Sequence, residues 1–262
     1  MARRIRVIGV GAGNPDHMTI EAINALNTCD VLFVPTKGEE KIFLADLRHA
    51  ICTRFISGTL PRVIDYSVPD RHRGGDYSLT VHEWHGAIAD IYEQLLCDQV
   101  EETDTVGLLI WGDPMLYDST IRIIEHVRER GRVAFDYDVI AGISSLQALC
   151  ASHRIPLNRI GGAITITTGR RLSQSWPDEV FDVAVMLDGV GAYQSIDDPH
   201  AEIYWGAYLG TPMEITMSGR VKEIASEISR LREAARAEHG WIMDTYLLRR
   251  PWEDSCESDV AS

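Results

Sequence analysis

The stretch Val106–Arg130, VGLLIWGDPMLYDSTIRIIEHVRER, joins a strand pattern to a helix pattern through a short turn. Val106–Trp111 is an apolar run of strand length, and Ser119–Arg130 carries apolar residues at helical spacing. The turn, Gly112–Asp118, contains a glycine that permits a tight bend and a proline that fixes the backbone, and Ser119 is a residue type that caps helices. A strand, a turn and a helix in this order form the unit from which parallel sheets are built.

The same alternation continues outward on both sides of this stretch. Further strands are predicted at Arg4–Val10, Val31–Val34 and Phe135–Ile140, and further helices at Thr19–Asn27, Phe43–Thr53, Thr80–Cys97 and Ser145–His153. Strands that alternate with helices require crossover connections. The sequence therefore predicts a first α/β domain, residues 1–158, around a mostly parallel sheet.

The pattern changes beyond residue 158. Strand patterns now follow one another closely, at Ala163–Thr168, Val183–Leu187, Glu202–Tyr208 and Glu214–Ser218, before one long helix at Val221–Glu238 and a last strand at Trp241–Leu248. Closely spaced strands favour antiparallel pairs within a mixed sheet. We predict a second α/β domain over residues 159–252, followed by a flexible acidic tail over residues 253–262.

The composition argues against several classes of protein. The chain of 262 residues is 45% hydrophobic, enough for a core in each of two modest domains, and its formal net charge of −14 argues against a nucleic-acid partner. No apolar run reaches membrane-spanning length, and Met1–Arg6 lacks the apolar core of a secretory signal. The five cysteines are scattered without a CxxC pair, so we expect reduced thiols, no metal site and a cytoplasmic location.

Two glycine-containing turns come near known motifs without matching them. Gly9–Asp16 has three glycines in five residues, which indicates a close backbone approach, but a dinucleotide-binding fingerprint needs glycine where Asn14 stands. Ala141–Ser145 could begin a hydrolase elbow, which would need glycine in place of Leu146. A dinucleotide-dependent oxidoreductase therefore remains only a distant alternative.

Asp113 follows a predicted strand directly. In an open parallel sheet, ligands bind at the edge where the strands end. A carboxylate there could accept hydrogen bonds from ribose hydroxyls or from an amine of a ligand. It could equally be satisfied by the backbone amides of a helix-entry turn, and the sequence leaves both interpretations open.

Other charged and titratable clusters give weaker signals. His82 and His85 can share one face of a helix, although a solvated face explains them better than metal ligation does. Arg170 and Arg171 end a predicted strand, where they could clamp carboxylates or form a surface turn. Arg71–Gly75 is a basic loop, interpreted either as a lid or as a solvated loop.

Taken in order, these turns are more specific than any one of them. GVGAGNPDHMT at 9–19, WGDPMLYDST at 111–120, VIAGISS at 139–145, TTGRR at 167–171, MLDG at 186–189 and YWGAYLGTP at 204–212 form an ordered set. The set resembles the tetrapyrrole (corrin/porphyrin) methylase family over residues 4–250. This resemblance implies two α/β domains with S-adenosylmethionine in the cleft between them, a homodimer, and methylation of a carbon in a tetrapyrrole substrate. S-adenosylhomocysteine would be the second product.

The resemblance also implies which residues contact the ligands. Those matching the family's cofactor contacts are Gly112, Asp113, Leu116, Ser144, Ser145, Met186, Leu187, Tyr208, Gly210 and Thr211. Gly11 and Gly13 belong to a loop that faces the tetrapyrrole in this family, and we add Arg170 and Arg171 as substrate-binding residues. Many members end in a proline-led strand where this chain has Gly240–Thr245, so no contact is assigned to the last strand.

The motifs are most similar to members that also remove an acetyl group, which implies hydrolytic loss of acetate beside methyl transfer. Methyl transfer needs mainly positioning, because the sulfonium is already activated. Hydrolysis would gain from a base for water and a donor for the oxyanion. We favour Asp16, His17 and Tyr117 for these roles over His82 and His85, because their turns should open on the cleft. Substrate electronics alone is the alternative.

Two further alternatives share the same fold. The first is methylation of another corrin carbon without loss of acetate, which the mass of the product would distinguish. The second is a tetrapyrrole carrier without catalytic activity, which would have no need of the turn at Gly112–Pro114.

Overall fold

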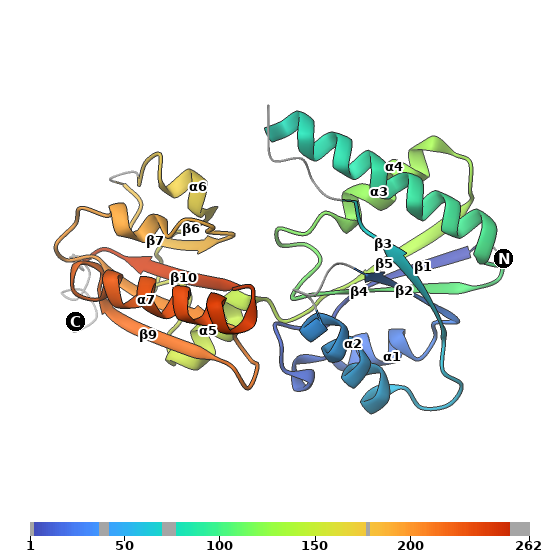
Figure 1. Cartoon of the computed structure of the whole chain (residues 1–262), viewed down its shortest axis with the longest axis horizontal. Helices are drawn as coiled ribbons and strands as arrows, with labels where there is room; N and C mark the ends of the chain where they lie inside the picture. The colour runs from blue at the N-terminus through green and yellow to red at the C-terminus, as the bar shows by residue number, and fades with distance from the viewer. Residues whose placement is uncertain (1–2, 37–41, 70–76, 177–178, 252–262) are drawn as a thin grey trace, which may run out of the picture. The chain divides into compact units, whose positions relative to one another are not determined.

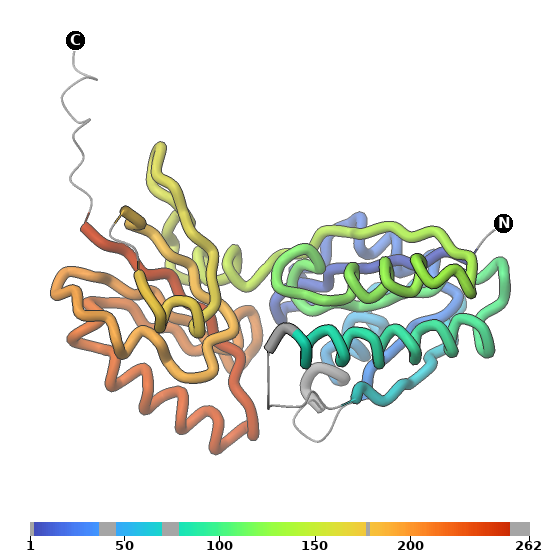
Figure 2. The backbone as a smooth tube through the Cα atoms, turned by 90° about the horizontal axis from the view of Figure 1, so that it is seen from above, coloured from blue at the N-terminus to red at the C-terminus, as the bar shows by residue number. Residues whose placement is uncertain are grey.

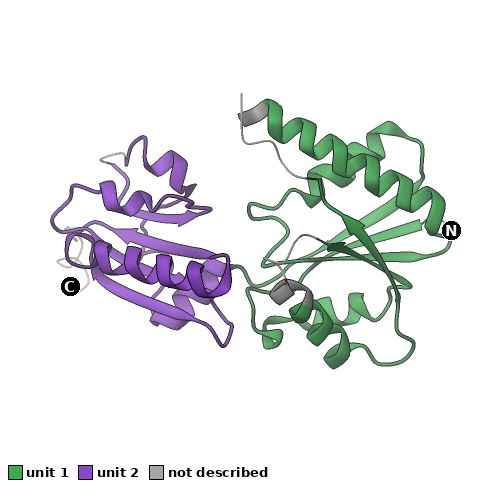
Figure 3. Ribbon diagram, viewed as in Figure 1, with its two compact units in different colours: residues 1–144 green, residues 145–262 purple. Residues whose placement is uncertain are grey.

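The computed structural model describes residues 3–36, 42–69, 77–176 and 179–251. The chain divides into two compact units, residues 1–144 and 145–262, which Figure 3 shows in green and purple. The basic loop Arg71–Gly75 and the tail over residues 253–262 lie outside the described residues. The domain boundary near residue 158 stays a prediction. The second compact unit begins with helix α5 (Ser145–His153), which packs against strands of that unit.

Unit 1 is built on a parallel five-stranded sheet with the strand order β3-β2-β4-β1-β5. Its strands are β1 (Arg3–Gly9), β2 (Val31–Thr36), β3 (Arg62–Ser67), β4 (Thr105–Ile110) and β5 (Phe135–Ile140). The connecting helices are α1 (Ile20–Leu26), α2 (Ile42–Phe55), α3 (Tyr77–Gln99) and α4 (Thr120–Arg130). In Figure 1, α1 and α2 lie on one face of this sheet and α3 and α4 on the other.

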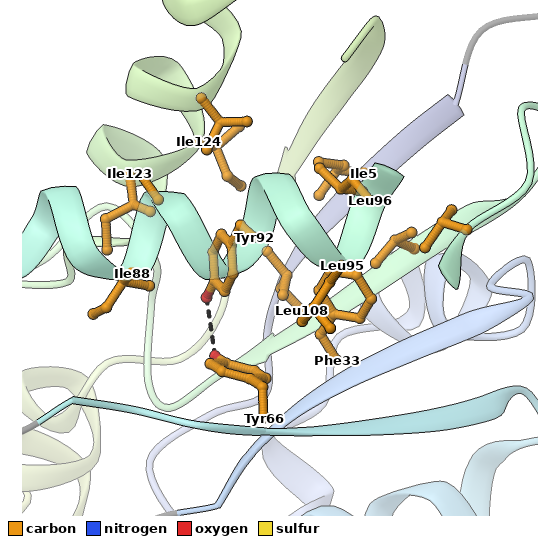
Figure 4. Packing of buried hydrophobic residues seen from close by; sticks show 14 of the residues in the cluster. Ile5, Phe33, Tyr66, Ile88, Tyr92, Leu95, Leu96, Leu108, Ile123 and Ile124 are labelled. Carbon is orange, nitrogen blue, oxygen red and sulfur yellow. Dashed lines mark hydrogen bonds between the residues drawn. The ribbon is translucent and has the colours of Figure 1, made fainter. Parts of the chain in front are cut away.

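Neighbouring residues of the central strands β1, β2 and β4 supply two different hydrophobic cores. Phe33 and Leu108 pack under α3 and α4, where the buried hydroxyls of Tyr66 and Tyr92 lie 3.0 Å apart (Figure 4). Leu109, the next residue of β4, points to the opposite face and packs with α1 and α2. The near-continuous apolar runs of the central strands follow from this, because both faces of a parallel sheet are covered.

Strand β3 is the element of unit 1 that the sequence pattern does not predict. It lies at the sheet edge and pairs with β2 alone. Of its residues, Ile64 and Tyr66 are buried, whereas Val63 is 55% exposed. An edge strand buries one face only, so its apolar signal is too short to separate it from a loop.

Unit 2 contains a mixed five-stranded sheet in the order β6-β7-β10-β8-β9. Its strands are β6 (Ile164–Thr168), β7 (Asp182–Met186), β8 (Glu202–Ala207), β9 (Ile215–Arg220) and β10 (Asp244–Arg249). The β6–β7 pair is parallel and the other three pairs are antiparallel. The predicted fold class, with one parallel and one mixed sheet, is thereby confirmed.

Helix α7 (Val221–His239) closes the core of unit 2. Its buried residues, among them Ile228, pack with Trp205, Tyr246 and Tyr193, all fully buried. Figure 2 shows the orange-red coil of α7 running beside the strands of this unit. Two short helical segments, α6 (Gly169–Leu172) and η3 (Ala192–Ser195), follow β6 and β7. Among the described residues, no helix is both long and apolar enough to cross a bilayer.

Candidate functional site

Three neighbouring strands of unit 1, β4, β1 and β5, end in turns that contact one another through glycine. A Cβ atom added to Gly9 would lie 2.6 Å from the backbone nitrogen of Gly142, and one added to Gly142 would strike the carbonyl oxygen of Gly112. These approaches leave no space for a side chain. The ends of β1, β4 and β5 (Figure 1) therefore form one closely packed backbone surface, which we call the glycine edge: Gly9, Gly11, Gly112 and Gly142.

A two-way backbone bridge joins the turn after β1 to the turn after β4. The Gly112 amide donates to the Gly11 carbonyl at 2.9 Å, and the Gly11 amide donates to the Gly112 carbonyl at 3.3 Å. Gly11 has φ +85° and Gly112 has φ +73°, a region that favours glycine. The chain leaves β1 towards β2 and β4 towards β5, in opposite directions along the sheet, which is where open α/β sheets bind ligands.

The expected close approach of backbone at Gly9–Gly13 is thus present, and its nearest partners are within unit 1. A Cβ atom on Gly11 would collide with the side chain of His17. Gly13, also buried, has φ +146°. These glycines let the turn fold back on its own helix-entry segment as well as on the turn after β4.

Asp113 ties two of the turns together. Its Oδ1 accepts from the Met115 amide at 2.8 Å, and its Oδ2 accepts from the Gly142 amide at 2.9 Å. Of the two interpretations left open by the sequence, the amide-satisfied turn describes this geometry. Each carboxylate oxygen keeps a second lone pair, so the half-buried side chain retains acceptor capacity for a ligand.

The turn after β4 presents apolar and aromatic side chains to solvent. Met115 is 63% exposed and Tyr117 is 42% exposed, while Leu116 between them is half-buried. Tyr117 has φ +54°, a conformation that costs a non-glycine residue free energy and concentrates at functional sites. The candidate Tyr117 is therefore held in place by the turn at the expense of backbone strain.

Ser119 does not cap helix α4, contrary to the sequence expectation. Its side chain makes no capping bond; the Thr120 amide is bound by Asp118 Oδ1 at 2.7 Å instead. Ser119 Oγ lies 2.8 Å from Nε2 of His85 on α3. Burial, followed by the nearby Arg122, lowers the pKa of His85. The neutral imidazole of His85 thus joins α3 to the end of the turn after β4.

The other histidine of the predicted pair lies apart from this contact. The His82 ring lies 6.2 Å from that of His126 on α4, and His82 is exposed. Among the described residues, no group of three or more histidines, cysteines or acidic residues is placed to hold a metal ion.

Asp16 and His17 lie in the short 3-10 helix η1 (Pro15–His17), directly after the turn of β1. The Asn14 side chain accepts from the Asp16 amide at 2.9 Å and so begins this helix. Asp16 is exposed and forms an ion pair with Arg54 of α2. His17 packs on Gly11, so of the two side chains it lies closer to the glycine edge.

The cofactor candidates of the second glycine turn sit at the start of α5. Ser144 is buried, and Ser145, the first residue of α5, is half-buried. Gly142 of the same turn is in contact with Gly9 and Gly112. The backbone of this turn is therefore fixed by the glycine edge.

In unit 2, the candidates Met186 and Leu187 lie at the end of β7. Met186 is half-buried, and Leu187 is 63% exposed with φ +54°. Asp188, which follows, was not singled out from the sequence although it is the most heavily bonded residue of this turn. Its carboxylate accepts from the amides of Val190, Gly191 and Ala192 and from the Tyr246 hydroxyl, at 2.7–3.1 Å. Its position directly after a buried strand, as at Asp113, is the signal that could have found it.

Tyr208, Gly210 and Thr211 form a closed turn after β8. The Tyr208 ring is buried in the core of unit 2, edge-on to Trp241 at 5.0 Å, and its hydroxyl donates to the Trp241 carbonyl at 2.5 Å. Thr211 Oγ1 donates to the Tyr208 carbonyl at 2.7 Å. The Tyr208 amide donates to the Met243 carbonyl at 3.0 Å, and its carbonyl also accepts from the Thr211 amide at 3.0 Å, so the polar groups of Tyr208 are engaged within unit 2.

Arg170 and Arg171 lie on α6 and are both exposed. Arg171 lines a cavity of about 270 Å³ together with Thr165, Thr167 and Trp176. Arg170 is not among the residues that line it. Of the two arginines, Arg171 is therefore the one that contributes to this cavity.

Comparison with known proteins points to one family. The sequence model described as "Tetrapyrrole (Corrin/Porphyrin) Methylases" matches residues 4–225. A precorrin-6A synthase (deacetylating) from Sinorhizobium sp is 57% identical over 249 residues, which cover 95% of each chain. A probable cobalt-precorrin-2 C(20)-methyltransferase from Methanocaldococcus jannaschii is 23% identical over 71% of this chain and 73% of its own.

Solved structures give the same result. A cobalamin synthesis related protein from Corynebacterium diphtheriae superposes with a TM-score of 0.82 at 38% identity, covering 95% of this chain and 99% of its own. A uroporphyrin-III-C-methyltransferase from Thermus thermophilus has a TM-score of 0.57 at 18% identity, covering 94% and 92% of the two chains. The latter similarity concerns the fold alone.

Proposed function

The chain belongs to the tetrapyrrole (corrin/porphyrin) methylase family, and from that premise we propose that it is a precorrin-6A synthase (deacetylating). It would convert precorrin-5, S-adenosylmethionine and water to precorrin-6A, S-adenosylhomocysteine and acetate in aerobic cobalamin biosynthesis. The observation that carries this proposal is the 57% identity to the relative of that name over 95% of both chains. A match of that length includes residues of both compact units.

The glycine edge of unit 1 suits the methyl donor. Gly112, Asp113 and Leu116 follow β4, and Ser144 and Ser145 follow β5, so backbone polar groups converge where two strands end. Asp113 keeps acceptor capacity for the donor's hydroxyls or amine, and its bonds to two amides fix its orientation. When bound, S-adenosylmethionine supplies a methyl group already activated by its sulfonium.

Unit 2 adds further residues that we propose as contacts of the methyl donor. Leu187 offers an exposed apolar side chain, and Met186 a half-buried one. Tyr208, Gly210 and Thr211 are proposed on the family resemblance alone, since the amides of all three already donate within unit 2.

For the acceptor we propose Gly11 and Gly13, through backbone contact, and Arg170 and Arg171, through the carboxylates of the corrin. A chain with a formal charge of −14 repels a polycarboxylate at long range, so local arginines must offset that repulsion. Arg171 is the better placed of the pair, because it lines a cavity.

Loss of the acetyl group needs acid–base help that methyl transfer does not. Water adds to the acetyl carbonyl carbon, and the C–C bond to the ring breaks, with its electron pair staying on the ring carbon and acetate leaving. We propose that His17 or Asp16 takes the proton of the attacking water and that the Tyr117 hydroxyl donates to the oxyanion. His17 packs against the glycine edge and Tyr117 is exposed on the turn after β4.

The decisive experiment incubates the purified protein with precorrin-5 and S-adenosylmethionine carrying a deuterated methyl group, then measures product masses and free acetate. A product that gains one labelled methyl and loses the acetyl group, with one acetate released, is expected. A methylated product that keeps the acetyl group would replace the proposal with the sister activity. Binding of precorrin-5 without turnover would leave a carrier.

We also propose a homodimer, on the basis of the family resemblance, and a cytoplasmic location, on the basis of the scattered cysteines. Light scattering coupled to size-exclusion chromatography should give a mass twice that of the 29.3 kDa chain. A mass of one chain at micromolar concentration would contradict this part of the proposal without touching the reaction.

A further inference from the structure

Arg48 on α2 is half-buried, and no acidic partner for it lies among the described residues. It stands next to Leu47, 7% exposed, which packs in the same core as the fully buried Ile51. Within the described part of the chain, no carboxylate lies within ion-pair distance of its guanidinium, and its side chain makes one long hydrogen bond of 3.5 Å, from Nε to the Leu109 carbonyl. Arg54 on the same helix, by contrast, is paired with Asp16.

The position of this guanidinium is at the carboxyl end of the sheet. Leu109 is the second-last residue of β4, the strand that leads into the turn with Gly112 and Asp113. Arg48 thus reaches the same edge as the candidate donor and acceptor residues, although it comes from a helix that the sequence motifs do not include.

The surroundings of Arg48 are phenolic rather than acidic. The phenols of Tyr66 and Tyr92 lie close enough to act on the pKa of Arg48, opposing the decrease that burial causes. Asp118 acts on the pKa of the same two phenols, but one of its oxygens already accepts from the Thr120 amide at 2.7 Å. In a pair of hydroxyls only one proton lies between the oxygens, so the Tyr66–Tyr92 pair leaves a second O–H donor in this region.

An unpaired cation that is partly withdrawn from water costs stability, because its desolvation is not compensated. Such a group is retained where a ligand completes the pair. A guanidinium at this edge complements an anionic acceptor, and its planar fork of N–H groups matches a carboxylate in particular.

We propose that Arg48 binds a carboxylate of a small-molecule ligand at the carboxyl edge of the unit 1 sheet. This inference rests on the proposed function for the choice of ligand. Two sources of the carboxylate fit the chemistry: an acidic side chain of the tetrapyrrole, or the amino-acid end of the methyl donor. The experiment below separates them.

The main variant is Arg48→Met, which keeps the apolar stem and removes the charge. Three quantities are measured: the Kd of S-adenosylhomocysteine by calorimetry, the KM of precorrin-5, and the Kd of uroporphyrin III, a stable tetrapyrrole octacarboxylate, by fluorescence. Loss of one charge-assisted pair should weaken the affected binding about 10- to 100-fold. A change in the S-adenosylhomocysteine Kd assigns the donor carboxylate, and a change in the two tetrapyrrole constants assigns the acceptor.

The matched control is Arg62→Met. Arg62 lies at the amino end of β3, where its guanidinium donates to the Gln99 carbonyl at 2.5 Å and lies 3.8 Å from Asp104. It removes the same charge from the opposite edge of the same sheet. All three binding constants should stay within twofold of the wild-type values.

Thermal unfolding separates a ligand-binding role from a structural one. Arg48→Met should keep or raise the melting temperature, since an apolar group replaces an uncompensated cation. Arg48→Lys keeps the charge without the fork, so its binding should lie between the wild type and Arg48→Met, and it serves alone if Arg48→Met does not fold.

Unchanged binding constants for all three ligands in both Arg48 variants would overturn the proposal, as would equal weakening in Arg62→Met. Failure of the proposed function has a different signature. In that case the wild type does not turn over precorrin-5, while S-adenosylhomocysteine and uroporphyrin III still report on Arg48.

Discussion

Two aspartates, one in each unit, lie in the turn after a strand and hold that turn in place, yet they differ in burial. Asp113 is half-buried and accepts from two amides, one of which belongs to the neighbouring turn after β5. Asp188 is 4% exposed and accepts from three amides and a tyrosine hydroxyl. Each follows a residue with positive φ, Gly112 or Leu187.

The difference shows how one local device serves two purposes. Where protein donors occupy the carboxylate oxygens, as at Asp188, the aspartate anchors the turn to the core. Where each oxygen keeps a lone pair facing a strand edge, as at Asp113, the turn is held in place and still offers an acceptor. The side chains alone do not distinguish the two cases; burial and the number of partners do.

The largest expected effect is on the stability of unit 2. Asp188→Ala leaves three amides and the Tyr246 hydroxyl without their acceptor, and should lower the free energy of unfolding by about 3–5 kcal/mol. Denaturant unfolding followed by circular dichroism measures this. Asp197→Ala removes an exposed acid paired with Lys222 and should change little. Equal stability of the two variants would remove Asp188 as an anchor.

Unlike Asp188→Ala, Asp113→Ala should lower ligand affinity more than it lowers stability. Loss of two amide bonds at a half-exposed site should cost only about 1–2 kcal/mol of stability. The Kd of S-adenosylhomocysteine should rise roughly 10- to 100-fold if Asp113 also binds the donor. Asp136→Ala, at an exposed acid of β5, is the control. A stability loss with unchanged donor affinity would make Asp113 a second anchor like Asp188.

Backbone strain at Tyr117 gives a smaller effect of opposite sign. Tyr117→Gly should raise the free energy of unfolding by about 1 kcal/mol, because glycine adopts positive φ without steric cost. Arg154→Gly, at another residue with positive φ, should gain the same amount without a change in activity. Tyr117→Phe keeps the strain and removes the hydroxyl. Acetate release under single turnover should slow in both Tyr117 variants, and normal rates in both would exclude Tyr117 from the reaction.

His85 gives the smallest expected effect, a shift with pH. Because its folded pKa is lowered from the ordinary value of 6.5, the unfolded state binds more protons as the pH falls. Stability should therefore be complete above pH 6.5 and decline below it as His85 is protonated. His85→Gln keeps a side chain that can form a hydrogen bond with Ser119. In this variant the melting temperature should change less between pH 7 and pH 5.5. His200→Gln, at an exposed histidine of unit 2, should keep the wild-type slope.

The sequence predicts the central elements well because their signals are local. β4 and α4 follow directly from the apolar run and the helical spacing of Val106–Arg130, and the ordered turns identify the family. The edge strand β3 escapes prediction, since only Ile64 and Tyr66 are buried there. The sequence also does not predict that Asp118 rather than Ser119 accepts from the first amide of α4. Ser119 is hydrogen-bonded to His85, which lies on a different helix.

The site is predicted less completely, for reasons of three-dimensional contact. Whether Tyr208 points its ring at a ligand or at the core depends on Trp241, a residue distant in sequence. Whether Asp113 is already hydrogen-bonded to the protein depends on Gly142, whose amide donates to Asp113 Oδ2. Arg48 carries no motif at all, and what distinguishes it is the absence of an acid among the described residues near it, which only coordinates reveal.

The contact of Gly9, Gly112 and Gly142 has a consequence for how the site can change. The three strand ends pack together through backbone atoms, and Asp113 joins two of their turns by hydrogen bonds. They therefore behave as one rigid block, and a ligand that displaces one turn must displace all three. A side chain has no space at Gly9 or Gly142, so neither position can be used to reshape the site. Divergence of substrate choice on this scaffold, and any attempt to redirect it, is therefore confined to the projecting positions around the block, of which Met115 and Tyr117 are the most accessible.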